Sequence, residues 1–236
     1  MKKISTVLLT AFLVLGLATT SLAQTRAEGG ITFAIGAPQG DFADQTDATG
    51  VGGHIFGAIG FAGSPIMVGI DVGYLIYGHD RRSEPFSTTI PDVTVDVTTD
   101  NNLVNGHLFL RLQPAASKVR PYADALFGFK YLFTETRIRS EGFNNGEDVA
   151  SSNNFSDTAL SYGAGGGVQF QVHSSDGLEG GPKAVYIDLG ARYLLGAEAR
   201  YLKEGSIRNV GGKAVYDTLK SKTDLLVFQL GVAFRF

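Results

Sequence analysis

The C-terminal segment 223–236 alternates between two kinds of side chain, and this pattern constrains the fold more than any other feature of the sequence. One face is apolar throughout and consists of Leu226, Phe228, Leu230, Val232, Phe234 and Phe236. The other face is small or polar and contains Thr223, Gln229, Gly231, Ala233 and Arg235. A period of two predicts a β-strand. A strand that is apolar outside and polar inside belongs in a lipid bilayer, whereas a soluble barrel needs its apolar face inside.

The N-terminus has the pattern of a secretory signal. Lys2 and Lys3 precede an apolar run over residues 7–17, and small residues occupy the cleavage positions after it. The run is shorter than the about 20 residues that a spanning helix needs. We therefore predict a signal peptide over 1–23 and Sec-type export. The mature domain, 24–236, has no other segment suited to a spanning helix and enters a membrane only as a barrel.

Composition excludes several other classes. The chain has no cysteine, so it carries neither a disulfide framework nor the cysteine of a lipoprotein anchor. Without the two leader lysines, the 20 basic residues fall to 18 against 23 acidic ones, and no basic patch indicates nucleic acid. The 31 glycines are interleaved with aromatic residues, which fits a twisted sheet around a narrow lumen.

Eight alternating segments, separated by turn or loop chemistry, follow the leader. They are Gly30–Ala37, Val51–Phe61, Ile66–Tyr77, Leu103–Leu112, Pro121–Thr134, Thr158–Val172, Ala184–Gly196 and 223–236. Mostly long connections alternate with shorter ones, as in membrane barrels with external loops and short periplasmic turns. We predict an all-β fold, an eight-stranded antiparallel up-and-down transmembrane β-barrel with long external loops. Closure also pairs every backbone donor and acceptor, which a bilayer demands.

The longer connections differ in pattern. Within the polar loop 78–102, the segment Val93–Thr98 alternates too, so we expect strands to continue above the membrane there as a ribbon. The segments 135–157 and 197–222 are expected as polar loops.

Three segments resemble strand signatures of the OmpA-like and OmpX-like small outer-membrane β-barrel domain proteins: Pro121–Gly128, Tyr162–Val168 and Ile187–Tyr193. The likeness extends over essentially the whole mature chain and concerns architecture, not activity. It implies the outer membrane of a Gram-negative cell envelope, with outer-membrane lipids and lipopolysaccharide as surroundings. OmpA itself continues into a peptidoglycan-binding domain, and we do not expect wall anchoring by such a domain here.

The C-terminus adds to this resemblance. In bacterial outer-membrane barrels the closing strand ends in an aromatic residue that the barrel assembly machinery reads. The resemblance implies that Phe234 and Phe236 serve as the assembly signal.

Strand phase places a set of charged residues in the lumen: Asp71, Arg111, Asp124, Lys130, Asp188, Arg192 and Arg235. Two histidines, His54 and His107, point inward as well. An eight-stranded interior is just wide enough for side chains to fill, and buried charges must be paired. We therefore favour a paired network that fills the lumen over a gated ion path. Which acid meets which base depends on strand stagger, which the sequence leaves open.

We assign no catalytic, cofactor-binding or metal-binding residue. His79 lies at the external rim beside Asp80 and near Ser83 and Glu84, and related outer-membrane lipid A acylases and deacylases use such groups there. The same cluster is ordinary in a solvated loop. Three aspartates of the first loop lack the ligand order of an EF-hand: Asp41, Asp44 and Asp47.

The function that these patterns favour is a structural or adhesive role carried by the extracellular loops, which would meet lipopolysaccharide or an extracellular partner. The alternative is a narrow porin-like channel for ions or small solutes. A third hypothesis is a lipid A-modifying enzyme at the outer rim. The inward glycines, aspartates and arginines argue against a soluble carrier barrel.

Overall fold

The computed structural model describes residues 25–46, 49–61, 63–87, 90–115, 117–140, 148–175, 181–202, 208–210, 213–215 and 217–236. The predicted signal peptide lies outside the described residues. Within them, no helix is long and apolar enough to cross a membrane.

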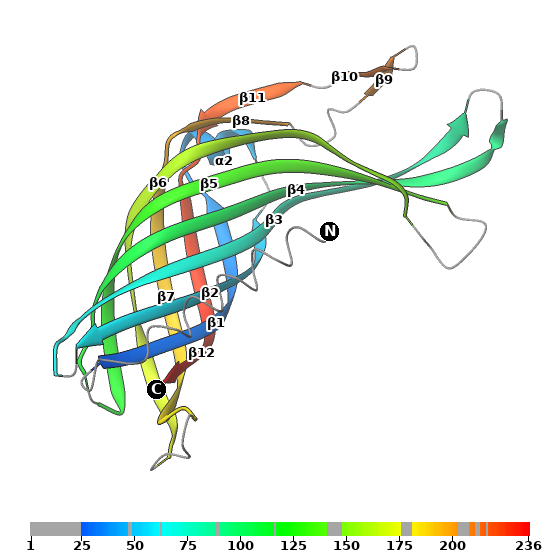
Figure 1. Cartoon of the computed structure of the whole chain (residues 1–236). Coiled ribbons are helices and arrows are strands. Elements are labelled where there is room, and N and C mark those ends of the chain that lie inside the picture. The colour runs from blue at the N-terminus through cyan, green and yellow to red at the C-terminus, as the bar shows by residue number, and fades with distance from the viewer. Residues whose placement is uncertain are drawn as a thin grey trace.

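Eight antiparallel strands close into a barrel in the order β1-β12-β7-β6-β5-β4-β3-β2 (Figure 1). Their bounds are Thr25–Pro38 (β1), Gly50–Phe61 (β2), Ile66–Ser87 (β3), Ile90–Leu112 (β4), Val119–Ser140 (β5), Asp148–Ser174 (β6), Ala184–Gly196 (β7) and Leu225–Arg235 (β12). The first and last strands pair with each other from Glu28↔Arg235 to Pro38↔Leu225, which leaves no open edge in the barrel wall. The predicted fold class is confirmed.

Side chains alternate across the wall as the sequence predicts. In β12, Phe228 and Leu230 are 52% and 53% exposed, whereas Val227 and Gln229 are 0% and 6% exposed. The apolar rows therefore face away from the barrel axis, where lipid surrounds them. The inner face of β12 also carries Leu225 and Val227, two apolar side chains that the sequence analysis did not place there.

Connections at the two ends of the barrel differ in kind. At the periplasmic end, where Thr25 and Arg235 lie, β2 and β3 are joined by a tight turn in which Gly63 has a φ of 81°. This left-handed conformation favours glycine. The extracellular end carries a short helix and two small hairpins: α2 (Asp41–Gln45), β8 (Glu198–Leu202) with β11 (Thr218–Lys222), and β9 (Arg208–Val210) with β10 (Lys213–Val215).

Four barrel strands continue far beyond the wall. Strands β3 and β4 stay paired up to Ser87↔Ile90, so the expected ribbon in the second loop is confirmed. Strands β5 and β6 also stay paired, up to Arg139↔Asp148, and the expectation of a loop over 135–157 is wrong for most of that segment. Its residues are largely polar, so no apolar alternation marks it as strand, and pairing there is carried by the backbone.

Whether the outer face of the wall lies in lipid can be tested by introducing an arginine at two depths in the bilayer. We expect Leu230→Arg, in the middle of β12, to lower the free energy of unfolding by about 2–4 kcal/mol, because an arginine at the bilayer midplane faces hydrocarbon. Val119→Arg, at the periplasmic end of β5, should cost at most about 1 kcal/mol, since it lies at the interface. Urea unfolding in lipid vesicles measures both, and equal costs would contradict the orientation.

Candidate functional site

The centre of the lumen is organised by one bidentate ion pair. Arg111 and Asp124 face each other across β4 and β5, and Arg111 donates from Nε to Oδ1 at 2.8 Å and from Nη2 to Oδ2 at 2.9 Å. The guanidinium carbon lies 4.0 Å from the ring centroid of Tyr122 and 5.2 Å from those of Phe56 and Phe109. Aromatic faces thus surround a cation whose charge is already neutralised.

Arg192 extends this pair across the lumen. Its Nη1 lies 2.8 Å from Asp71 Oδ1, and its Nη2 lies 3.8 Å from Asp124 Oδ2. The same Asp71 oxygen lies 3.0 Å from His54 Nδ1. Gly73 makes room for that imidazole, because a Cβ there would lie 2.4 Å from its ring. These groups are buried and connected from β2 to β7.

Among the described residues, Asp188 joins the network through neutral donors. One carboxylate oxygen accepts a hydrogen bond from Tyr122 Oη at 2.8 Å, and the other accepts one from Gln169 Nε2 at 3.0 Å. The tyrosine fits only because position 190 is Gly190, where a Cβ would lie 2.4 Å from the phenolic oxygen. The lumen carboxylates therefore accept hydrogen bonds from both charged and neutral donors.

The two remaining predicted residues lie apart, toward opposite ends. Lys130 is fully buried, and its Nζ donates to the carbonyl oxygens of Leu194 (3.0 Å) and Thr223 (2.5 Å) near the extracellular end. At the periplasmic end, Arg235 Nη1 donates to the carbonyl oxygen of Ala115 at 3.3 Å. Backbone carbonyls, rather than carboxylates, hold both cations.

A further charged group at the periplasmic end was missed by the sequence analysis. Glu28 accepts a hydrogen bond from Arg120, which also donates to Gln113 Oε1 at 2.7 Å, and Arg26 lies beside the same carboxylate. The first predicted strand begins at Gly30, and Arg120 lies in the connection between two predicted strands. Extending the period of two backward from Gly30 would have placed both Glu28 and Arg26 inside.

An aromatic cap fills the extracellular end of the lumen. Phe42 of α2 is fully buried, and its ring centroid lies 5.6 Å from that of Tyr77 and 5.3 Å from that of Tyr201. Burial raises the pKa of the Tyr201 hydroxyl, which lies 2.7 Å from Ser221 Oγ of the neighbouring strand. Helix α2 and the β8/β11 hairpin thus cover the mouth of the barrel, with Phe42 beneath them.

His79 and His107 each lie beside a polar side chain of another strand. His79 Nδ1 lies 2.6 Å from Asp100 Oδ1 on the neighbouring strand, and its side chain is exposed. In the lumen, His107 Nε2 lies 2.9 Å from Ser161 Oγ, and Ser161 is fully buried.

Acidic loop residues form no metal centre within the described ranges. Asp41 and Asp44 lie in the first turn of α2, whereas Asp47 is outside the described residues. No group of three or more histidine, cysteine or acidic side chains in the described part of the chain can hold a metal ion.

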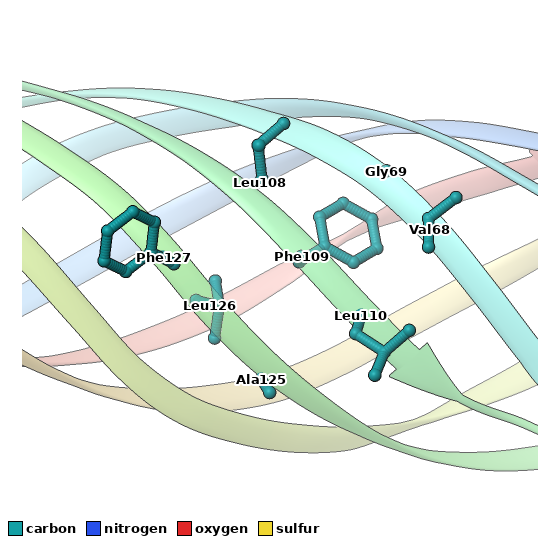
Figure 2. Close-up of a pocket in the computed structure, with 8 residues that line it drawn as sticks. All are labelled: Val68, Gly69, Leu108, Phe109, Leu110, Ala125, Leu126 and Phe127. Atoms are coloured by element: carbon teal, nitrogen blue, oxygen red, sulfur yellow. The ribbon is translucent and has the colours of Figure 1, made fainter.

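A shallow apolar depression lies on the outer wall of β3, β4 and β5. Figure 2 shows its lining residues, Val68, Gly69, Leu108, Phe109, Leu110, Ala125, Leu126 and Phe127. On the outer face Ala125 is the small residue among larger side chains, whereas Phe109 and Leu126 are buried on the lumen side, where the Phe109 ring packs against Gly69. This depression is part of the apolar outer surface of the wall.

The closed wall, the apolar exterior and the filled lumen agree with a comparison by sequence. The family model of the outer membrane protein beta-barrel domain matches residues 8–236. The chain belongs to this family. It is therefore an integral protein of the outer membrane.

Solved structures of other outer-membrane barrels resemble this member of the family. Neisserial surface protein A is 13% identical, with 89% of this chain and 95% of that chain covered and a TM-score of 0.36. Ail of Yersinia pestis is 15% identical, with 89% and 99% covered and a TM-score of 0.37. OprG of Pseudomonas aeruginosa is 12% identical, with 90% and 95% covered and a TM-score of 0.40. No curated protein matches the sequence.

Replacing one partner of the Arg111–Asp124 pair should destabilise the barrel more than replacing both. We expect Arg111→Met to lower the free energy of unfolding by about 3–5 kcal/mol, because Asp124 keeps only the more distant Arg192. The double variant Arg111→Met with Asp124→Leu should recover part of that loss. Urea unfolding in lipid vesicles gives both values, with Lys220→Met in the exposed pair with Glu198 as a control of little effect. A single variant as stable as the wild type would refute the assignment.

Proposed function

We propose that this outer-membrane barrel is a closed, non-conducting anchor that presents an extracellular β-ribbon to a protein partner. The extracellular ribbon comprises residues 78–87, 90–101, 134–140 and 148–157, the parts of β3, β4, β5 and β6 that continue past the barrel wall. Figure 1 shows it curving away from the barrel to one side. The observation that carries the proposal is this long, paired extension.

The outer face of the ribbon carries polar and charged side chains suited to contact with water. At the last apolar level, Ile76, Asn102 and Phe133 are cross-strand neighbours, and Tyr74 donates a hydrogen bond to Asn102 Oδ1. At the next level the neighbours are His79, Asp100 and Glu135. The change from apolar to charged side chains supports the proposal that the strands leave the hydrocarbon core of the bilayer at this height.

One edge of the ribbon is open. Strand β2 pairs with β3 only as far as Val51↔Ile76, and beyond that point β3 pairs with β4 alone among the described strands. An unpaired strand edge offers backbone donors and acceptors to an extended segment of another protein. Such strand addition is the mode of partner binding that we propose.

The filled lumen supports an anchor rather than a channel. Ion pairs occupy its centre, and the aromatic cap around Phe42 covers its extracellular end. An eight-stranded barrel has no width to spare once such side chains point inward.

We further propose that the chain reaches the membrane by Sec-type export and that the assembly machinery reads its closing strand. In β12 the ring of Phe234 faces the lipid side, and Phe236 follows the strand with 48% exposure. Contact with lipopolysaccharide is proposed at the charged outer face above the apolar wall.

Planar-bilayer recording tests the closed lumen. We expect no stable conductance from the wild-type protein, because the charged centre and the aromatic cap together block the path. The double variant Phe42→Ala with Arg192→Ala, which opens the cap and removes a central cation, should introduce current. Arg200→Ala, outside the lumen on β8, should stay silent. Stable conductance of the wild type would contradict the anchor and favour the channel.

Site-specific cross-linking on intact cells tests the open edge. We expect a photoreactive amino acid at Ser83, an exposed position of β3 in the ribbon, to give a protein adduct of one defined size. The same group at Lys220, exposed on β11, serves as the matched control and should give none, because β11 lies outside the ribbon. Absence of an adduct at Ser83, or equal adducts at both positions, would refute partner binding at the ribbon.

A further inference from the structure

Charge is distributed unevenly along the lumen. In its centre and upper part, three bases match three acids: Arg111, Lys130 and Arg192 against Asp71, Asp124 and Asp188. Among the described residues at the periplasmic end, Arg26 and Arg120 pair with the carboxylate of Glu28, and Arg235 lies opposite Glu28 on β12. We call these three arginines the periplasmic arginine cluster.

Arg26 is the least satisfied member of the cluster. It is 6% exposed, and none of its three guanidinium nitrogens makes a hydrogen bond to a described residue. Its Nε lies 3.7 Å from Glu28 Oε1, and the positive charges of Arg120 and Arg235 act on it from nearby. A buried guanidinium with five unused N–H donors is costly in free energy unless a partner accepts them.

The other two arginines are already engaged, but incompletely. Arg120 is fully buried, donates to Glu28, Gln113 and the Pro114 carbonyl oxygen, and lies 4.8 Å from the ring centroid of Tyr186. Its Nη1 and the Oε2 atom of Glu28 have no partner among the described residues. Arg235 donates to the Ala115 carbonyl oxygen. Both arginines thus hold the β4–β5 connector against the periplasmic mouth while excess positive charge remains.

We propose that the periplasmic arginine cluster binds a phosphate group. Among the described residues, the cluster carries two positive charges more than Glu28 balances, and a phosphate supplies negative charge together with several acceptor oxygens. The planar fork of a guanidinium matches two oxygens of such a group, and Arg26 has its whole fork free of hydrogen bonds. This site is independent of the ribbon and of the proposed partner.

Two sources can supply the phosphate. One is inorganic phosphate from the periplasm. The other is the head group of an anionic phospholipid, since β1 and β12 meet at the periplasmic edge of the wall, where head groups of the inner leaflet lie. The chemistry that recognises the two is the same, so the experiment must separate them.

Binding is measured on the folded protein in maltoside micelles, which contain no phosphate. One arm titrates inorganic phosphate, and the other titrates short-chain phosphatidylglycerol, with short-chain diacylglycerol as its phosphate-free counterpart. We expect at least one phosphate source to bind in calorimetry and to raise the thermal midpoint of unfolding. Arg26→Gln should weaken that binding by about tenfold or more, because a charge-assisted contact is lost. Arg200→Gln, the same charge change on the extracellular side, should leave it unchanged.

Two further readouts separate binding from a structural role. Without phosphate, Arg26→Gln should raise the thermal midpoint, because it removes a buried charge that lies beside two others and makes no hydrogen bond to a described residue. Glu28→Gln should tighten phosphate binding, because it removes the competing carboxylate. The proposal is overturned if neither source binds the wild type, if Arg26→Gln binds as tightly as the wild type, or if Arg26→Gln lowers the midpoint in phosphate-free buffer.

Discussion

The interior of an eight-stranded barrel is only as wide as the side chains that line it, and the rest of this structure depends on that limit. Some large inward side chains fit only beside a glycine. His54 fits against Gly73, and Tyr122 fits against Gly190. These glycines are therefore part of the polar network, although they carry no polar side chain, because they set which rings reach Asp71 and Asp188. Packing thus selects the ion pairs.

Because side chains fill the lumen, the surfaces that remain for binding are the two ends and the exterior of the barrel. The central charges are paired or held by neutral donors, and the aromatic cap around Phe42 separates them from the extracellular side. Such a network in a region of low dielectric rigidifies the wall, and it has little freedom to rearrange. A rigid wall in turn supports long strand extensions, because four strands leave the barrel already paired and in register.

Alternation alone predicted the strand count, the closure and the face of nearly every barrel residue, because the period of two is a local property of each strand. It did not predict which charges meet. Arg111 faces Asp124 directly across β4 and β5, but Arg192 reaches Asp71 across the lumen, and that contact depends on tilt and stagger. Helix α2 escaped prediction because five residues with one buried side chain have no periodicity. Of the periplasmic arginine cluster, alternation placed Arg235 in the lumen, whereas Arg26 and Arg120 escaped because they lie at strand ends.

One extra residue at the extracellular rim of β3 changes which side chains of this strand face outward. The pairing with β4 shifts between Ile76 and Gly78, so Tyr77 is an extra residue and a bulge bends the strand. Below it the exposed residues of β3 have even numbers, and above it His79 and Arg81 are exposed instead. Tyr77 points inward against Phe42 with the same parity as Leu75, and the slip exchanges the faces after it, so that Gly78 is buried and His79 points outward. The bulge also lies where β2 stops pairing, so the bend carries β3 away from its barrel neighbour and leaves the edge of the ribbon open.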